Sequence, residues 1–489
     1  MSALDITPTI PERPKGLPVS FWIPYVCIPV LCLMCLRIMS TGPLVHLPLQ
    51  AQAAYNEGYN AYRAAYVATG VPLYGRPIGQ CPTNYPPISF WVAGILSHYL
   101  GGVNTAGRWI SIVSWLLVSV ELGFIVVKLG GELTTAAYCG LMFLFLTSAF
   151  APSFVATNDP QMLGHALVMA GVALYVWRSH ADPWVLAVCA IVICFGLFVK
   201  QNLLVFPIAI TIDLWLWSRK RLAIWVLSCG ATLASLAAIS IYREGPYFLE
   251  HLLAPRTYSF GKAGVYLGIF CVLFQLVFTI CLVWAAVVRK HLLAWALYAA
   301  LGLGFVFSGG GGTYVNMAFE MIVVLCLICA LAVGQRDAST MSFPRMRHVI
   351  AAAPLVILVP ALGLTLVTTN KKEVILQDAA DYRADVNYIK SRPGDAICEN
   401  LLLCFDSGKP LVYDPFWTKE LILVGRIQEQ TVLNALRSHR YSVIQIDLAQ
   451  LHALLPLERD RFTRRFMETL LSTYREDRRH ASRVFLVPR

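Results

Sequence analysis

The chain carries little charge for its length. Only 14% of its 489 residues are Asp, Glu, Lys or Arg, and 57% are hydrophobic. A typical soluble domain is about 25% charged, so this composition excludes a disordered chain, a coiled coil and a string of soluble domains. Residues 1–369 hold 20 of the 39 Lys and Arg and 12 of the 28 Asp and Glu, and residues 370–489 hold the remaining 19 and 16. The first three quarters therefore predict a polytopic membrane protein, and the last quarter predicts a soluble domain.

The sequence also lacks a cluster of His and Cys with the spacing of a zinc site. Eleven of the 14 cysteines lie in apolar runs, where they behave as small hydrophobic residues. Cys398 and Cys404 are the plausible local pair, and a disulfide and two buried thiols remain equally open. The net charge of +11 lies mostly in clusters beside apolar runs, which favours membrane lipids, and no nucleic acid, as partners.

Eleven apolar stretches approach or exceed the roughly 17 residues that a membrane crossing needs. With residues 1–19 in the cytoplasm, the short inner connections carry 12 basic residues and the longer outer ones carry 8, as the positive-inside rule requires. Residues 86–100 are apolar but short, begin with two prolines and are followed by two glycines, so an interfacial helix is expected there. The predicted spans are 20–39, 108–128, 134–155, 160–177, 184–200, 202–217, 222–241, 264–287, 291–308, 317–334 and 348–368.

The fold class that follows is an α-helical polytopic membrane protein with a small C-terminal α/β domain on the outer, periplasmic side of the inner membrane. We predict that residues 1–19 are the cytoplasmic N-terminus and that residues 20–369 are the transmembrane domain. Residues 40–107 form an outer loop far longer than ordinary connections, and such loops are usually functional. In residues 370–489 we expect strands at 395–399, 410–414 and 441–447, and helices near 377–391, 429–439 and 457–477.

Two acidic residues lie beside the predicted outer membrane surface, where an ionisable group is costly and indicates function. Glu57 lies in the long outer loop, flanked by tyrosines. We predict that it faces a cavity as a general base or metal ligand; the alternative is an exposed helix glutamate. Asp159 precedes Pro160 and is predicted to be catalytic, a role compatible with capping the next helix. No cofactor is certain, and a divalent metal ion on Glu57 and Asp159 is the open alternative.

Cations and polar side chains on the outer segments complete the predicted site. Lys200 ends the fifth span, so it either snorkels to the surface or binds a phosphate there. Arg243, Arg256 and Lys262, on another outer loop, are predicted to share that phosphate. Gly309–Gly312 lacks the Lys of a phosphate-binding loop and is predicted to be a flexible turn. The other predicted residues of the substrate cavity are Asn60, Tyr62, Arg63, Tyr85, Tyr314, Asn316 and Glu320.

The order of these segments resembles a known family. The long outer loop reads NEGYNAYRAAYVATGVPLYG and TNYPPISFW, GRWISIVSWLL opens the second span, ATNDP precedes the fourth and FVKQN closes the fifth. In this order, and on these sides of the membrane, they resemble the GT-C superfamily of integral-membrane glycosyltransferases. The resemblance is to the protein O-mannosyltransferases and aminoarabinose transferases in particular, and it covers roughly residues 20–335.

The resemblance implies roles for particular residues. Glu57 matches the acidic residue of the family's first outer loop, where many relatives carry Asp or an Asp-Glu pair. Asp159 matches the acidic residue of the second outer loop, and Lys200 matches the lysine near the donor phosphate. The prolines after Tyr85 match the start of an interfacial helix.

These observations together predict a glycosyltransferase. A hexose or pentose would move from a polyprenyl phosphate to a hydroxyl of a glycan, lipid or protein at the outer face of the membrane. Glu57 would be the base of a single displacement, because a phosphate leaving group needs no protonation, unlike the leaving group of a two-carboxylate hydrolase. The alternatives are a lipid or saccharide transporter, which should show inverted halves, and a scaffold subunit with an inactive site.

Overall fold

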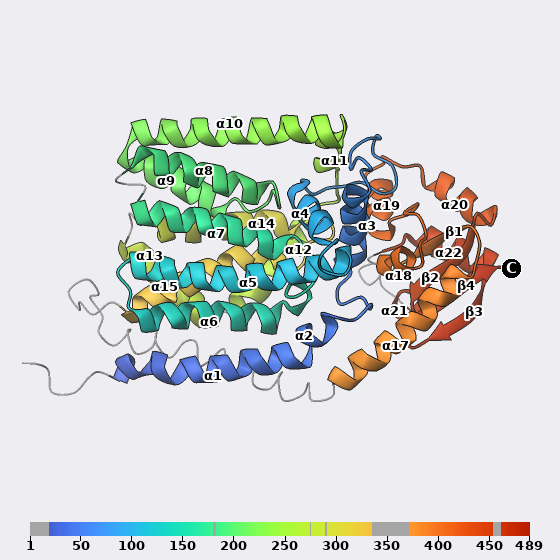
Figure 1. Cartoon of the computed structure of the whole chain (residues 1–489), viewed down its shortest axis with the longest axis horizontal. Coiled ribbons are helices and arrows are strands. Elements are labelled where there is room, and N and C mark those ends of the chain that lie inside the picture. The colour runs from blue at the N-terminus through green and yellow to red at the C-terminus, as the bar shows by residue number, and fades with distance from the viewer. Residues whose placement is uncertain (1–18, 179–181, 274, 289–290, 335–370, 453–460) are drawn as a thin grey trace, which may run out of the picture.

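The computed structural model describes residues 19–178, 182–273, 275–288, 291–334, 371–452 and 461–489. Its long helices lie side by side in one bundle, and the C-terminal domain lies at one end of that bundle (Figure 1). The bundle contains α1 (Val19–Thr41), α5 (Val103–Lys128), α6 (Leu133–Phe150), α7 (Gln161–Arg178), α8 (Pro183–Leu197), α9 (Val205–Trp217), α10 (Arg219–Glu244), α12 (Phe260–Leu273), α13 (Gln275–Val288), α14 (Leu292–Ser308) and α15 (Phe319–Gly334).

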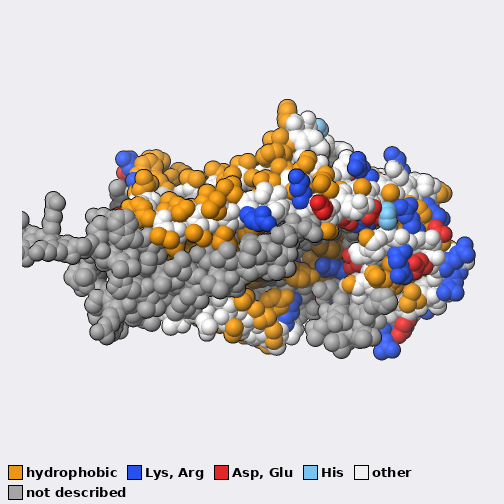
Figure 2. Space-filling view, turned by 90° about the horizontal axis from the view of Figure 1, so that it is seen from below, with side chains coloured by type: hydrophobic (Ala, Val, Ile, Leu, Met, Phe, Trp, Pro, Cys, Tyr) orange, Lys and Arg blue, Asp and Glu red, His pale blue; other side chains and the backbone are white. Residues whose placement is uncertain are grey.

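The outside of the bundle is apolar. Leu33, Val120 and Leu227 expose 67%, 69% and 71% of their surface. Figure 2 shows hydrophobic side chains over the described part of the bundle, whereas charged side chains gather mainly at the C-terminal domain. Five of the described helices are long and apolar enough to cross a membrane, and four shorter helices are also apolar. Helices with lipid-compatible side chains and internally satisfied backbones are what a bilayer selects.

The predicted spans agree with these helices. Each of the ten predicted spans that the described residues cover coincides with helix, and the span at 264–287 is helical on both sides of residue 274, as α12 and α13. The predicted span at 348–368 lies outside the described residues. Residues 86–100 form only the nine-residue α4 (Ile88–Leu96), which at about 14 Å is too short to cross a bilayer. This length agrees with the expectation of an interfacial helix.

The predicted outer segments meet at the end of the bundle that carries the C-terminal domain (Figure 1). They include α2 (Pro43–His46), α3 (Asn56–Ala68), α4 and α11 (Phe248–Leu252). Helix α3 packs against α4, α5 and α18 (Leu401–Asp406) of the C-terminal domain. At Gly58 the approach is so close that a Cβ would overlap the backbone of Leu401 and Leu402, so glycine is required there.

The C-terminal domain has a four-stranded sheet in the order β1-β2-β4-β3. Strands β1 (Asp395–Cys398) and β2 (Tyr441–Asp447) are parallel, and β3 (Tyr474–His480) and β4 (Arg483–Pro488) complete the sheet in antiparallel fashion. Its helices are α17 (Lys371–Lys390), α18, α19 (Pro415–Leu423), α20 (Glu429–Arg437), α21 (Leu448–His452) and α22 (Arg464–Thr473).

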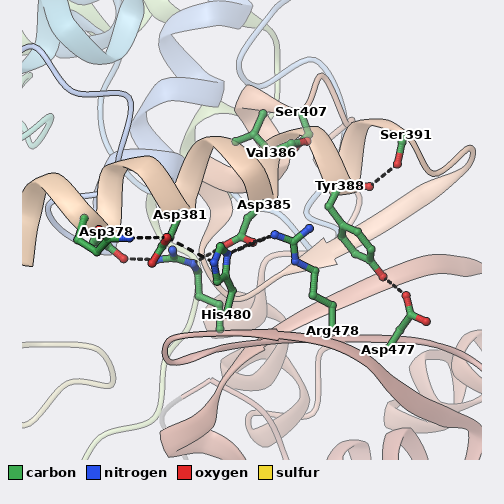
Figure 3. A network of polar contacts seen from close by, with 12 residues as sticks. Asp378, Asp381, Asp385, Val386, Tyr388, Ser391, Ser407, Asp477, Arg478 and His480 are labelled. Carbon is green, nitrogen blue, oxygen red and sulfur yellow. Dashed lines mark hydrogen bonds and ion pairs between the residues drawn. The ribbon is translucent and has the colours of Figure 1, made fainter.

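Two predictions for this domain were wrong. Residues 410–414 form no strand, and the helix predicted at 457–477 ends at Thr473, where β3 begins. Strand β3 reads YREDRRH, a charged sequence without hydrophobic alternation, because one face carries a polar network (Figure 3). Asp385 of α17 accepts from Arg483 Nε at 2.7 Å and lies 3.0 Å from His480 Nδ1. These charged contacts attach α17 to the sheet.

A disulfide joins Cys398, at the end of β1, to Cys404 in α18. This decides between the two states that the sequence left open. The bond attaches α18 to β1 of the sheet. Helix α18 also packs against α3. The C-terminal domain is therefore connected through α18 to the long outer loop.

Candidate active site

A cavity of about 510 Å³ lies where the outer end of the bundle meets the C-terminal domain. This volume is in the range of small-molecule sites. Separate stretches of chain line it: the start of α3, the segment before α4, the turn between α8 and α9, the loop before α12, the glycine-rich turn after α14, and the C-terminal domain. Its principal lining residues are Tyr55, Asn56, Tyr85, Lys200, Gln201, Asn202, Arg256, Tyr314, Asn316, Asp414, Phe416, Trp417 and Arg461.

The pair formed by Lys200 and Asp159 lies at the bundle side of the cavity. Lys200 lines the cavity but exposes only 1% of its surface, and its Nζ lies 3.4 Å from Asp159 Oδ1. Gln161 N donates to the same carboxylate at 2.8 Å, which confirms that Asp159 caps α7. Asn56 Nδ2 donates to Oδ2 at 2.9 Å. Because Asn56 and Lys200 both line the cavity and both contact Asp159, the carboxylate lies immediately behind that wall.

Of the other predicted phosphate-binding cations, only Arg256 lines the cavity. Its guanidinium carbon lies 4.9 Å from the centre of the Trp417 ring. Arg243 is exposed and lies over Trp91, and Lys262 Nζ donates to Gly310 O at 2.9 Å, which holds the glycine-rich turn. The structure therefore brings Lys200 and Arg256 together and leaves the other two cations outside the cavity.

The prediction that Glu57 faces a cavity is wrong. Glu57 is completely buried and receives Nε and Nη2 of Arg108, each at 2.7 Å. The backbone N–H groups of Ala53 and Asn158 also donate to it, at 2.7 and 3.2 Å. Bidentate pairing with a buried arginine, together with two amide donors, occupies the carboxylate. Sequence reasoning missed the partner because Arg108 lies on α5, far along the chain.

The remaining predicted cavity residues divide into two groups. Tyr85, Tyr314 and Asn316 line the cavity as expected. The other four are engaged elsewhere, because their polar groups bond the backbone of neighbouring segments. Asn60 donates to Asn158 O, Tyr62 to Lys409 O and Arg63 to Cys81 O and Pro82 O, while Glu320 accepts from Val205 N.

The run Gly309–Gly312 forms a tightly packed turn, whereas a flexible one was expected. A Cβ at Gly309 would lie 2.6 Å from Tyr258 Cζ. Cβ atoms at Gly311 and Gly312 would overlap Glu420 and Phe416 of the C-terminal domain, and Gly312 also has a φ of +67°. Glycine is needed here because side chains from two other segments occupy the space that a Cβ would fill.

Sequence reasoning missed the contribution of the C-terminal domain to the cavity. Asp414 caps α19, since Trp417 N donates to its Oδ1 at 3.0 Å, and burial raises the pKa of its carboxyl to about 6. Phe416 and Arg461 line the same wall. The stretch Asp-Pro-Phe-Trp at 414–417, a cap followed by two aromatic residues, was the one local signal.

The described residues hold no group of three or more His, Cys, Asp or Glu side chains arranged to bind a metal ion. The two candidate metal ligands of the sequence are instead each paired with a cation, Glu57 with Arg108 and Asp159 with Lys200. The arrangement can bind an anion at Lys200 and Arg256, next to a carboxylate that can accept a proton.

The sequence matches no protein-family model and no curated protein. Solved structures are similar to it in fold. ArnT from Cupriavidus metallidurans in the apo state has 13% sequence identity and a TM-score of 0.62, over 94% of this chain and 97% of that one. The same protein bound to undecaprenyl phosphate has 12% identity and a TM-score of 0.59, over 96% and 98%.

An oligosaccharyltransferase from Archaeoglobus fulgidus, tethered to an acceptor peptide, is also similar. It has 10% identity and a TM-score of 0.54, over 88% of this chain and 70% of that one. Both neighbours are glycosyltransferases of the GT-C type. At such low identities the likeness concerns the fold, and it covers 88–96% of this chain. The chain has the GT-C fold.

Proposed function

We propose that this protein is a glycosyltransferase that moves a sugar from a polyprenyl phosphate to an acceptor hydroxyl at the outer face of the cytoplasmic membrane. The observation that carries the proposal is the cavity at the end of a membrane bundle, with Lys200 and Arg256 on its wall and Asp159 behind it. The fold supports it, since one neighbour was solved with undecaprenyl phosphate and another with an acceptor peptide.

Lys200 and Arg256 are the groups suited to the donor phosphate. Charge-assisted hydrogen bonds to phosphate are strong, and they are strengthened where water is excluded, as it is around a nearly buried lysine. Gln201 and Asn202, beside Lys200 on the wall, each hold an amide oxygen without a partner among the described residues. Sugar hydroxyls are donors that would satisfy them.

Asp159 replaces Glu57 as the proposed base. The acceptor oxygen would attack the anomeric carbon, the bond from that carbon to the phosphate oxygen would break, and Asp159 would take the acceptor proton. The Lys200 Nζ contact of 3.4 Å is long for an ion pair, so an arriving phosphate can draw the lysine away and free the carboxylate. Glu57, occupied by Arg108, positions the loop instead.

The proposal includes an orientation. Residues 1–19 would lie in the cytoplasm and residues 370–489 outside, so that donor and acceptor meet on the outer side. The basic residues on short loops support this direction, and the outer loops and C-terminal domain share one end of the bundle (Figure 1). Residues 20–369 would then be the membrane domain of the enzyme.

Donor binding and turnover test the proposal separately. Purified protein in nanodiscs should be stabilised by polyprenyl phosphate, because a ligand that binds the folded state raises the melting temperature. Lys200→Ala should weaken that effect about tenfold or more. Lys128→Ala is the matched control, since Lys128 Nζ also lies over an aromatic ring, 5.2 Å from the Phe124 centre, but away from the cavity.

Turnover is then measured as polyprenyl phosphate released from a labelled polyprenyl-phosphate sugar, with a membrane extract as the source of acceptor. Release that requires the extract is expected. Protein that binds the donor and moves it across liposomes without consuming it would instead be a transporter, and the proposal would be wrong.

A further inference from the structure

The C-terminal domain supplies one wall of the cavity with an arginine that contacts three segments of chain. Arg461 Nη2 donates to Tyr314 OH at 3.1 Å, and its guanidinium carbon lies 3.6 Å from the centre of the Tyr55 ring. The Phe416 ring lies on another side of it, at 5.9 Å. An arginine stacked on aromatic rings is held in a defined plane. The contacts of Arg461 therefore give this wall a fixed arrangement.

This wall has no excess of positive charge. Arg461 interacts electrostatically with Asp414, Glu399 and Asp447. Burial raises the pKa of Glu399 to about 8 and that of Asp414 to about 6. Arg461 therefore lies among three acidic residues. A phosphate or carboxylate ligand would gain little there.

The part of the cavity around Lys200 differs. Lys200 and Arg256 interact electrostatically, Arg256 lies over the Trp417 ring, and Asp159 is the one acidic residue paired with either cation among the described residues. Electrostatic complementarity therefore favours the phosphate at Lys200 and a neutral ligand at Arg461. The two walls of one cavity suit two different substrates, which is what a transfer reaction needs.

The chemistry of the Arg461 wall suits a sugar. Tyr55 and Phe416 offer rings on which the apolar face of a pyranose can stack. The amide N–H of Trp417 holds the Asp414 carboxylate in place, and a carboxylate has capacity for about four hydrogen bonds, so acceptor sites remain for sugar hydroxyls. Phe416 is itself fixed, because it packs where a Cβ of Gly312 would lie.

We propose that Asp414, Phe416 and Arg461, together with Tyr55, form the acceptor subsite, and that the acceptor is an uncharged saccharide unit. The inference rests on the proposed function, and it deepens that function by naming the class of acceptor. The C-terminal domain is then the specificity-determining part of the enzyme, and the bundle is the part that binds the donor.

Binding of defined glycans to the full-length protein in nanodiscs, without donor, tests the subsite. The probes are neutral oligosaccharides and their uronic-acid or phosphorylated counterparts, compared by saturation-transfer NMR. Neutral glycans should bind better than the anionic ones. Asp414→Asn keeps a good helix cap and should weaken neutral-glycan binding about tenfold, and Phe416→Leu should do so by removing the stacking ring.

The matched control is Asp477→Asn, which changes a carboxylate of the same domain that accepts from Tyr388 OH and does not line the cavity (Figure 3). It should bind glycans as the wild type does. Stabilisation by polyprenyl phosphate should be unchanged in Asp414→Asn, so failure of donor binding and failure of the acceptor subsite are separate results. Preference for anionic glycans, or neutral-glycan binding unaffected by both Asp414→Asn and Phe416→Leu, would overturn the inference.

Discussion

Two buried carboxylates lie at the same end of the bundle, and they differ in what surrounds them. Glu57 is enclosed by Arg108 and two backbone donors, with cation contacts of 2.7 Å. Asp159 has a longer cation contact of 3.4 Å, to a lysine that itself lines the cavity. Both are acidic, buried and paired with a cation. They differ in that the Asp159 carboxylate contacts two residues that line the cavity, Asn56 and Lys200, whereas the side-chain partners of Glu57 do not line it.

The Glu57 region acts as an anchor for the outer loop. Besides Glu57, Arg108 Nη1 donates to Leu49 O at 2.7 Å, so one side chain ties α3 and the chain before it to α5. A buried charge with all its partners present is stable, but it becomes costly when one partner is removed. The two regions should therefore respond in opposite ways to similar substitutions.

Asp159→Asn should have the largest effect, and that effect should be on turnover. A general base contributes about 10²–10⁴-fold in rate, and Asn remains a good cap for α7, so the fold should persist. Release of polyprenyl phosphate and the melting temperature, measured on the same preparation, check this. If turnover of the variant stayed within a few-fold of the wild type, Asp159 would not be the general base.

Glu57→Gln should act on stability instead. It leaves the Arg108 guanidinium buried without a counter-charge, which costs roughly 3–5 kcal/mol in comparable pairs. Yield and melting temperature should fall, while turnover per folded molecule should stay near normal. Glu468→Gln is the control, since its exposed pair with Arg464 should be worth about 0–1 kcal/mol. A stable Glu57→Gln protein without turnover would contradict the assignment of Glu57 to stability and of Asp159 to catalysis.

Reduction of the Cys398–Cys404 disulfide should have the smallest effect. A loop this short contributes about 2 kcal/mol by the chain-entropy model. Because α18 packs on α3, hydrogen exchange should increase in 398–406 and then in 56–68, and the turn at 159–161 should keep its protection. The Cys398→Ser/Cys404→Ser double variant should behave as the reduced protein does. Equal loss of protection in both regions would show that they are not separate units.

Local patterns were sufficient for the bundle and for one of the two carboxylates. Runs of apolar residues predict helices because the hydrophobic side chains themselves require burial or lipid. Asp159 before Pro160 predicts a cap, and a cap depends only on the next residues in the chain. The short α4 could be recognised from the prolines and glycines that bound it.

Contacts between distant segments could not be read in this way. The partner of Glu57, Arg108, is 51 residues away on another helix. The spacing of residues in the sequence does not indicate that the two side chains form an ion pair. The packing of Gly312 against Phe416 depends on how the C-terminal domain docks. Strand β3 was missed because its exposed side chains are charged, so it lacks the alternation by which strands are recognised.

The wall that the C-terminal domain contributes also has a consequence for biosynthesis. Asp414, Phe416 and Arg461 are translated after every described helix of the bundle. A nascent chain that has made α1–α15 therefore already holds Lys200 and Asp159, but it lacks the wall that the last domain contributes. In multidomain chains the N-terminal parts fold first during synthesis. Under the proposed function, sugar transfer would begin only when the last domain has been made, so that an incomplete chain would not consume donor before its acceptor site exists.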